Sequence, residues 1–327
     1  MRARLLTNPV TEISLISLFA FLLSLSLALF SSSIALANST GDQLESDLAT
    51  MLLMQDLGLT NHPQAAETHR EIVSDGANDT VEVSLYANIV GDIHLLIKGP
   101  HGFLTSNQRY ITLLIASGIY TGKESIGLLS QLPGVVLVGI DYPNSIQSIL
   151  TDPQNAFQFL RRTPGNIALS LEWLSRQSWV EGRGPSAMGV SLGGLFLPVA
   201  LRMAQKLGVV IPRNVFAFTG SDLITIASNN LKNSVADNIK GPLLQLVSGL
   251  TLLNDPRLHL PFVPGDHLVV RADNDQTIPA SSTDQLFDLL QGSKQSVVLH
   301  GGHIGSDTPD LISATESAIL AWIDQGF

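Results

Sequence analysis

Short, uniformly apolar runs alternate with helical patterns through most of this 327-residue chain. A strand that is apolar on both sides has to be covered on both faces, and helices between consecutive strands provide that cover. The alternation therefore predicts an α/β fold with a mostly parallel, doubly wound sheet. The expected strands are 110–116, 135–140, 186–190, 215–219, 267–272 and 296–300, and the expected helices are 122–131, 157–162, 167–177, 195–207, 282–290 and 311–323.

A different pattern precedes this region. Val81, Val83 and Leu85 alternate with Glu82, Ser84 and Tyr86, which is typical of a strand with one buried face. A Gly-Asp pair then leads into a second apolar run at 93–98. The two segments predict an N-terminal antiparallel hairpin in the same sheet.

The first 37 residues have the composition of an export signal. Arg2 and Arg4 precede an apolar stretch at 13–30, and a small-x-small cleavage site ends at Ala37. We therefore expect a signal peptide over residues 1–37 and an exported chain, periplasmic or secreted. The apolar stretch holds 18 residues, close to the length that spans a bilayer. The alternative is that this stretch stays as an N-terminal membrane anchor.

The rest of the chain divides by composition. Residues 38–75 are polar and charged, with a helix expected at 47–57, and we interpret them as a lead-in segment. Residues 76–327 form the α/β domain. Within it, 221–265 breaks the alternation with an apolar run at 242–253 and several prolines. A connection this long usually has structure or function of its own, so we interpret it as a helical insert. Its apolar run is either a lid or a plain core helix.

Composition narrows the classes of partner and cofactor. The chain has 18 basic and 28 acidic residues, a net charge of −10, and no basic run. This balance argues against nucleic acid or an anionic membrane as the main partner. With no cysteine, the chain has no disulfide, no thiolate zinc site, no lipoprotein anchor and no cysteine nucleophile. The histidines show no metal-ligand spacing, and we expect neither a metal nor a cofactor.

A G-x-S-x-G motif, Gly189 to Gly193, lies between an expected strand and an expected helix. A serine on such a tight turn is held above the sheet by a strained backbone, and the glycines remove side chains that would clash. The helix that follows directs its free N–H groups toward an anion at the serine. In this context the motif predicts that Ser191 is a nucleophile.

With this motif in place, the chain resembles the α/β-hydrolase superfamily, in its serine esterase and lipase branch. The resemblance extends from about residue 80 to the end, with 221–265 the least matched part. It implies a catalytic triad in the chain order serine, acid, histidine. It also implies a small-molecule ester or acyl substrate.

The family's acid follows a late strand, in a frame that ends with proline. Asp275 fits this frame, with Pro279 four residues later and Ala272 where glycine is commoner. Asp273 in the same loop is one alternative, and Asp222 at the end of the preceding strand is another. An acid that is not catalytic would have an ordinary role in helix or turn capping.

The family's histidine lies in a glycine-rich loop after the last strand. His303, preceded by Gly301 and Gly302, fits that position. The alternative is His300, which ends the strand and fits a structural role better.

For the oxyanion hole, the resemblance implies two backbone N–H groups. One is that of Leu192, directly after the nucleophile. The other belongs to the loop at 117–122, where Ile119 is our choice and Tyr120 the next. This loop opens with Ser-Gly where the family usually has His-Gly. A literal His-Gly pair, His101 and Gly102, lies one strand too early, and we interpret it as a turn.

The sequence thus predicts an exported serine hydrolase that cleaves carboxylic esters through an acyl-enzyme on Ser191, with Asp275 and His303. A serine peptidase or acyltransferase of the same fold is the nearest alternative. A non-catalytic binding module that kept the fold is the alternative from another class.

Overall fold

The computed structural model describes residues 43–118, 121–129, 132, 134–142, 152–230 and 252–325. The expected signal peptide and nearly all of the apolar run at 242–253 lie outside these ranges, so their interpretation stays a prediction. Among the described helices, none is both long and apolar enough to cross a membrane.

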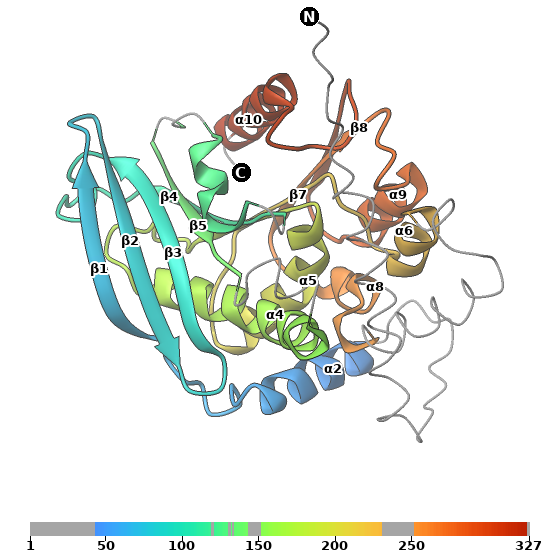
Figure 1. The fold of residues 1–327 in the computed structure, drawn as a ribbon, viewed down its shortest axis with the longest axis horizontal. Coiled ribbons are helices and arrows are strands. Elements are labelled where there is room, and N and C mark those ends of the chain that lie inside the picture. Colours follow the sequence, from blue (N-terminus) through green and yellow to red (C-terminus); the bar gives the residue numbers. More distant parts are fainter. Residues whose placement is uncertain are drawn as a thin grey trace, which may run out of the picture.

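One sheet organises the described residues (Figure 1). Its strand order is β1-β2-β3-β5-β4-β6-β7-β8-β9. From β5 to β9 all neighbouring strands are parallel, whereas β1, β2 and β3 pair in antiparallel fashion and β3 pairs antiparallel with β5. The mostly parallel α/β class predicted from the sequence is confirmed. The strands are β1 (Ala66–Ser74), β2 (Asn78–Ala87), β3 (Gly91–Pro100), β4 (Ile111–Ala116), β5 (Val135–Ile140), β6 (Ser186–Val190), β7 (Arg213–Ala217), β8 (Asp266–Ala272) and β9 (Lys294–Leu299).

Helices cover both faces of this sheet, which is why its central strands can be apolar on both sides. Figure 1 shows α10 on one side of the sheet and α4, α5 and α2 on the other. In β4, Leu114 packs in the core under α4 and α5, while its neighbours Leu113 and Ile115 pack in the core under α10. The longer helices are α2 (Gln43–Asp56), α4 (Pro153–Ser175), α5 (Leu192–Lys206), α6 (Leu223–Asn230), α9 (Ala280–Leu289) and α10 (Pro309–Asp324), and the short ones are η1 (Gly122–Gly127), η2 (Leu252–Asn254), α8 (Pro256–His259) and η3 (Leu260–Phe262).

Two helical regions differ from the expectation. The sequence predicts two helices at 157–162 and 167–177, but α4 runs through nearly all of both and contains Pro164. A β-carbon at Gly165 would lie 2.7 Å from the Leu57 side chain, so the glycine lets α4 pack closely against the segment that follows α2. Of the helix expected at 122–131, residues 122–127 form the 3₁₀ helix η1, and residues 130 and 131 lie outside the described ranges.

Strand β1 is not predicted by the sequence. All nine of its residues are exposed, so it has no apolar alternation to reveal it. It forms because its backbone pairs with β2 along almost its whole length. Strand β1 is the first strand of the main sheet, and α2 packs on α5.

Candidate active site

Ser191 lies at the tight turn between β6 and α5. Its backbone angles are φ 51° and ψ −119°, and among the described residues only two other non-glycine residues have positive φ. A conformation of this kind is strained and persists only where the surroundings enforce it. Here the Ser191 N–H donates to the carbonyl of Ala217 at 2.9 Å, which holds the turn against β7.

The glycines of the motif are required by space. A β-carbon at Gly193 would lie 2.0 Å from the carbonyl oxygen of Ala116, at the end of β4. One at Gly189 would lie 2.5 Å from the α-carbon of Gly194. Both distances are far inside van der Waals contact, so the turn closes over the strand ends only with glycine at these positions.

The structure brings Ser191, His303 and Asp275 together in one hydrogen-bonded series. The Ser191 Oγ lies 2.8 Å from His303 Nε2, and His303 Nδ1 lies 2.8 Å from Asp275 Oδ2. The side chains of His303 and Asp275 are 19% and 5% exposed. A carboxylate at Nδ1 makes that nitrogen the donor, which leaves Nε2 free to accept the serine proton.

Asp275 is itself held in place. Its Oδ1 accepts hydrogen bonds from the backbone N–H groups of Thr277 and Ile278, at 2.8 and 2.9 Å. These bonds orient the carboxylate so that Oδ2 faces the imidazole. The ring of Phe218, directly after β7, meets the His303 ring edge-on, with 6.4 Å between the centroids. The histidine is therefore fixed on one side by charge and on another by packing.

The alternative residues of the sequence analysis have other partners. Asp273 Oδ2 lies 2.8 Å from His300 Nδ1, so the two alternatives pair with each other. Asp222 caps α6, where its Oδ1 accepts from the N–H groups of Ile224 and Thr225 at 3.0 and 3.1 Å. This is the capping role expected of an acid outside the triad. Within the part of the chain that the structure describes, none of the three hydrogen-bonds to the side chain of Ser191 or His303.

Of the backbone groups proposed for the oxyanion hole, the structure describes that of Leu192 only. Leu192 is the first residue of α5, a position whose N–H has no acceptor within the helix. Ile119 and Tyr120 lie outside the described residues, so their role stays a prediction. Ser117 of the same loop is described, and its carbonyl oxygen would lie 2.8 Å from a β-carbon at Gly193. The first residue of the 117–122 loop therefore packs directly on the turn that holds Ser191.

Sequence reasoning missed one residue of this region, Tyr142. Its hydroxyl donates to the carbonyl of Ser117, and burial raises the pKa of the phenol, so the group stays a donor. Tyr142 is the middle residue of the Asp-Tyr-Pro run that follows β5. That run marks the end of a strand in the sequence, but no local pattern shows that its tyrosine reaches the neighbouring loop.

The His-Gly pair at 101–102 forms a turn after β3, as expected. Asp79 holds this turn: His101 Nδ1 lies 2.9 Å from Asp79 Oδ1, and the Gly102 N–H donates to Oδ2 at 2.8 Å. No group of three or more acidic or histidine side chains suited to a metal is present in the described ranges.

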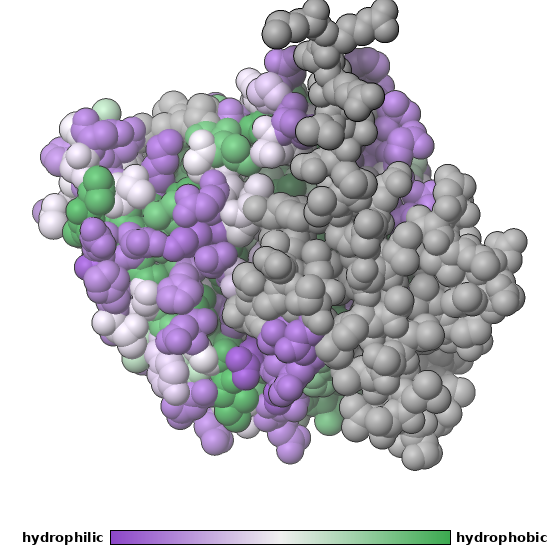
Figure 2. All heavy atoms as spheres, in the orientation of Figure 1, coloured by the Kyte–Doolittle hydropathy of each residue, from purple (hydrophilic) through white to green (hydrophobic). Residues whose placement is uncertain are grey.

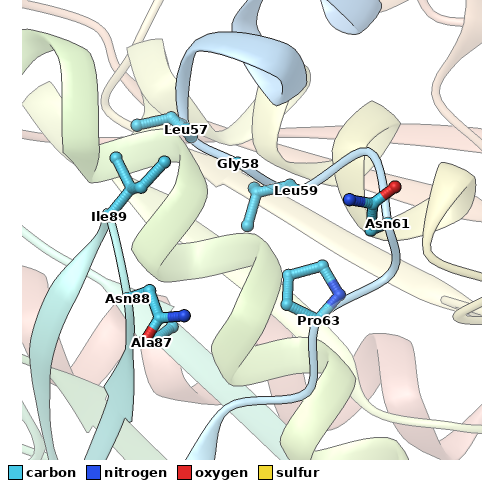
Figure 3. Close-up of a pocket in the computed structure, with 8 residues that line it drawn as sticks. All are labelled: Leu57, Gly58, Leu59, Asn61, Pro63, Ala87, Asn88 and Ile89. Atoms are coloured by element: carbon cyan, nitrogen blue, oxygen red, sulfur yellow. The ribbon is translucent and has the colours of Figure 1, made fainter.

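A cavity of about 290 Å³ lies elsewhere, between the segment that follows α2 and the β2–β3 turn (Figure 3). Leu57, Leu59 and Ile89 line it, together with Asn61, Asn88 and other residues of the two segments. None of its lining residues belongs to the triad, so the cavity is separate from the chemistry at Ser191.

Comparison with known proteins finds similarity in structure alone. No protein-family model matches the chain, and no curated protein sequence does. Among solved structures, an acetyl xylan esterase from Paenibacillus sp. R4 aligns with a TM-score of 0.65 at 15% identity, covering 88% of this chain and 96% of that one. Acetyl xylan esterase 1 from Thermoanaerobacterium sp. JW/SL YS485 aligns with a TM-score of 0.58 at 12% identity, covering 86% and 95%.

A hyperthermophilic esterase from the archaeon Pyrobaculum calidifontis aligns over 97% of this chain and 98% of its own, with a TM-score of 0.50 at 13% identity. At such identities the likeness concerns the fold. Together with the strand order and the strained serine turn between β6 and α5, it identifies the architecture: the chain has the fold of the α/β-hydrolase superfamily.

Proposed function

We propose that this protein is an exported serine hydrolase that cleaves carboxylic esters through an acyl-enzyme on Ser191. The observation that carries the proposal is the series Ser191–His303–Asp275, with 2.8 Å at each of its two contacts. A nucleophile in contact with a base, and a base oriented by a buried acid, is the arrangement that activates a hydroxyl for acyl transfer.

In the first half-reaction, His303 Nε2 takes the hydroxyl proton as Ser191 Oγ bonds to the ester carbonyl carbon. The carbonyl oxygen becomes an oxyanion, which accepts from the N–H of Leu192 and, in our proposal, that of Ile119. The protonated His303 then gives its proton to the leaving alkoxide, and the alcohol departs. In the second half-reaction His303 deprotonates a water that attacks the acyl-enzyme, and the acid is released with Ser191 restored.

Asp275 keeps its charge through both steps. It holds the Nδ1–H of His303 and so fixes the tautomer in which Nε2 is the base. It also stabilises the imidazolium that forms when the serine proton is transferred. Its low exposure, 5%, keeps water away from this contact.

Ester cleavage is favoured over its alternatives by the fold comparison, since the three similar solved structures named above are esterases. The triad itself could equally cleave an amide, or transfer the acyl group to an acceptor other than water. A peptidase or acyltransferase of the same fold therefore stays the alternative. A binding module without catalysis is disfavoured by the strained turn at Ser191, because strain of this kind is retained where a site needs it.

The decisive experiment is covalent labelling with a fluorophosphonate probe, followed by peptide mapping. We expect the probe on Ser191 in the native chain and no labelling in Ser191→Ala with an unchanged circular dichroism spectrum. Labelling of another serine, or none in the native chain, would reject the proposal. A panel of p-nitrophenyl esters and aminoacyl p-nitroanilides then separates esterase from peptidase.

Export is tested separately, by sequencing the N-terminus of the protein made in a secreting host. A chain beginning at Asn38 would support cleavage after Ala37. An intact Met1 in the membrane fraction would support the anchor.

A further inference from the structure

Two asparagines at the end of helix α6 reach across to the loop at 273–279, which we call the acid loop. Asn229 Nδ2 donates to the carbonyl of Gln276 at 2.7 Å, and Asn230 Nδ2 donates to the carbonyl of Thr277 at 2.9 Å. Both asparagines are partly buried. Since a carbonyl oxygen can only accept, the amide nitrogen of each side chain is the atom that faces the loop.

The carbonyls that the asparagines hold belong to the same peptide units that hold the acid of the triad. One unit joins Gln276 to Thr277, and the next joins Thr277 to Ile278. Their N–H groups donate to Asp275 Oδ1 at 2.8 and 2.9 Å. A trans peptide unit is planar, so its C=O and its N–H point in opposite directions. A hydrogen bond that fixes the carbonyl therefore also fixes the N–H that meets the carboxylate.

Asn230 is held on its own helix as well. Its Nδ2 also donates to the carbonyl of Ile226 at 2.9 Å, so one amide nitrogen bridges a carbonyl of α6 and a carbonyl of the acid loop. An amide supplies the two N–H groups that this bridge needs, whereas an aspartate has none and a serine has a single O–H. The bond to the helix fixes the rotamer of the side chain in the direction of the loop.

The start of α6 is fixed to α9, the helix that follows the acid loop. The backbone N–H groups of Ser221 and Asp222 donate to the carbonyl and the hydroxyl of Ser282, at 3.1 and 3.0 Å. A β-carbon at Gly220 would lie 2.3 Å from that hydroxyl oxygen, so the contact is close. Figure 1 shows α6 beside α9. Helix α6 is thus attached to α9 at its start and to the acid loop at its end.

We propose that Asn229 and Asn230 are positioning residues that act on the triad through Asp275. The inference rests on the proposed function, because it assigns a role in the same chemistry. The series of hydrogen bonds runs from each asparagine through one peptide unit to Asp275, and from there through His303 to Ser191. A hydrogen bond at the carbonyl of a peptide unit also polarises its N–H, which strengthens the bond to the carboxylate.

Without the asparagines, the two loop carbonyls would bond to water. Figure 2 shows hydrophilic residues at the surface on the side of the molecule where Figure 1 has β8 and α9, so water reaches this region. Water bonds to a carbonyl in many orientations, and the two peptide units would turn more freely. Asp275 would then lose its fixed direction toward His303, and a misplacement of ~1 Å can lower a rate by ~100-fold.

The test replaces each asparagine by leucine, which has nearly the same shape and no N–H. The full-length double variant Asn229→Leu, Asn230→Leu is treated with a fluorophosphonate, and the rate of labelling at Ser191 is measured beside kcat and KM on a p-nitrophenyl ester. We expect the labelling rate and kcat to fall by roughly 10- to 100-fold. KM should change little, because the orientation of the acid matters in the transition state.

The same two substitutions in the Asp275→Asn background show whether the effect passes through the acid. We expect them to change the labelling rate there by less than about twofold, since substitutions that act through one residue are not additive. Equal fold-losses in the two backgrounds would overturn the proposal, because the asparagines would then act independently of Asp275.

The matched control is Asn214→Leu. Asn214 Nδ2 donates to the carbonyl of Pro264 at 2.6 Å, near the start of β7 and so at the opposite end of the sheet from the triad. This variant loses a bond of the same kind, and we expect it to label at the native rate even where thermal unfolding shows lower stability. A loss as large as that of the double variant would overturn the proposal, since general loosening would explain both.

The outcomes also separate this inference from the proposed function. A native chain that is not labelled at Ser191 would reject the proposed function, whereas native labelling in the double variant would reject only the role of the asparagines. Circular dichroism checks the fold of each variant. The single variants Asn229→Leu and Asn230→Leu perturb the fold less, and each should lower the labelling rate by roughly threefold to tenfold. Native rates in both single variants would equally reject the role.

Discussion

Asp273 and His300 pair with each other, with 2.8 Å between Oδ2 and Nδ1, and they lie in the same two loops as Asp275 and His303. The outer pair faces water: the His300 side chain is 97% exposed, against 19% for His303. Asp273 Oδ1 also accepts from the Gly301 N–H at 3.0 Å, so it ties the acid loop to the histidine loop. The N–H of Gly301 and then His300 lower the pKa of Asp273, and Asp273 in turn raises the pKa of His300. Two acid–histidine pairs thus stand side by side, and only the inner one reaches Ser191.

The first prediction separates the acids. Asp275→Asn should lower kcat by about 10⁴-fold, because the amide favours the wrong tautomer of His303. KM should change little, since the loss falls on the transition state. Asp273→Asn and Asp222→Asn, compared at matched circular dichroism, should be mild. If Asp222→Asn lost nearly all of its activity while Asp275→Asn kept nearly native kcat, Asp222 would be the acid of the triad.

The second prediction concerns the turn under Ser191. Gly193→Ala should abolish activity and lower stability, because the new methyl group would lie 2.0 Å from the Ala116 carbonyl oxygen, within backbone. Gly127→Ala is the matched control, since nothing lies within 4 Å of its added carbon. Thermal unfolding and esterase rates measure both variants. A stable, active Gly193→Ala would contradict the close packing of β4 against the turn.

The third prediction concerns Tyr142. Tyr142→Phe removes the hydroxyl that donates to the Ser117 carbonyl and so loosens the loop assigned to the second oxyanion donor. Because this hydrogen bond supports the loop and does not contact the substrate, its loss should lower kcat by roughly tenfold and leave KM nearly unchanged. Steady-state kinetics on a p-nitrophenyl ester checks this. A change confined to KM would place Tyr142 in substrate binding instead.

The fourth prediction concerns acid stability. Burial lowers the pKa of His259 to about 4; the charge of Arg202 acts in the same direction, and the hydrogen bond to the Leu253 carbonyl acts against it. Burial also lowers the pKa of His267 to about 4. An unfolded histidine titrates near 6.5, so between pH 6.5 and 4 the unfolded chain binds the extra protons. Stability should therefore fall as pH falls through this window, by about 3 kcal/mol for each residue at most.

The midpoint of urea unfolding, measured from pH 7 to pH 4, reports this loss. His259→Gln, which can still accept at one end and donate at the other, should flatten the dependence on pH while lowering stability at pH 7 only moderately. The carboxyl groups of Asp222 and Asp273 have lowered pKa values, so their losses fall below this window. An unchanged slope in His259→Gln would show that other groups cause the acid sensitivity.

The sequence by itself determined the central sheet and the nucleophile turn, because both depend on local patterns. A strand covered on both faces needs a mostly apolar run, as β5 has throughout and β4 has apart from Thr112. The turn needs glycine where a side chain would meet backbone, and Gly189 and Gly193 stand at those positions. The order of serine, acid and histidine along the chain then limited the candidates to a few residues.

Tertiary structure decided what no local pattern encodes. Strand β1 exists through backbone pairing with β2 alone, since its side chains are exposed on both faces. The choice between Asp273 and Asp275 depends on the path of one loop, in which residues two positions apart meet different histidines. On α2, the outward direction of Leu44, Leu48 and Leu52 follows from polar partners of the opposite side on α5 and α8, more than 150 residues away. Contacts between distant segments set these features, so only the folded chain reveals them.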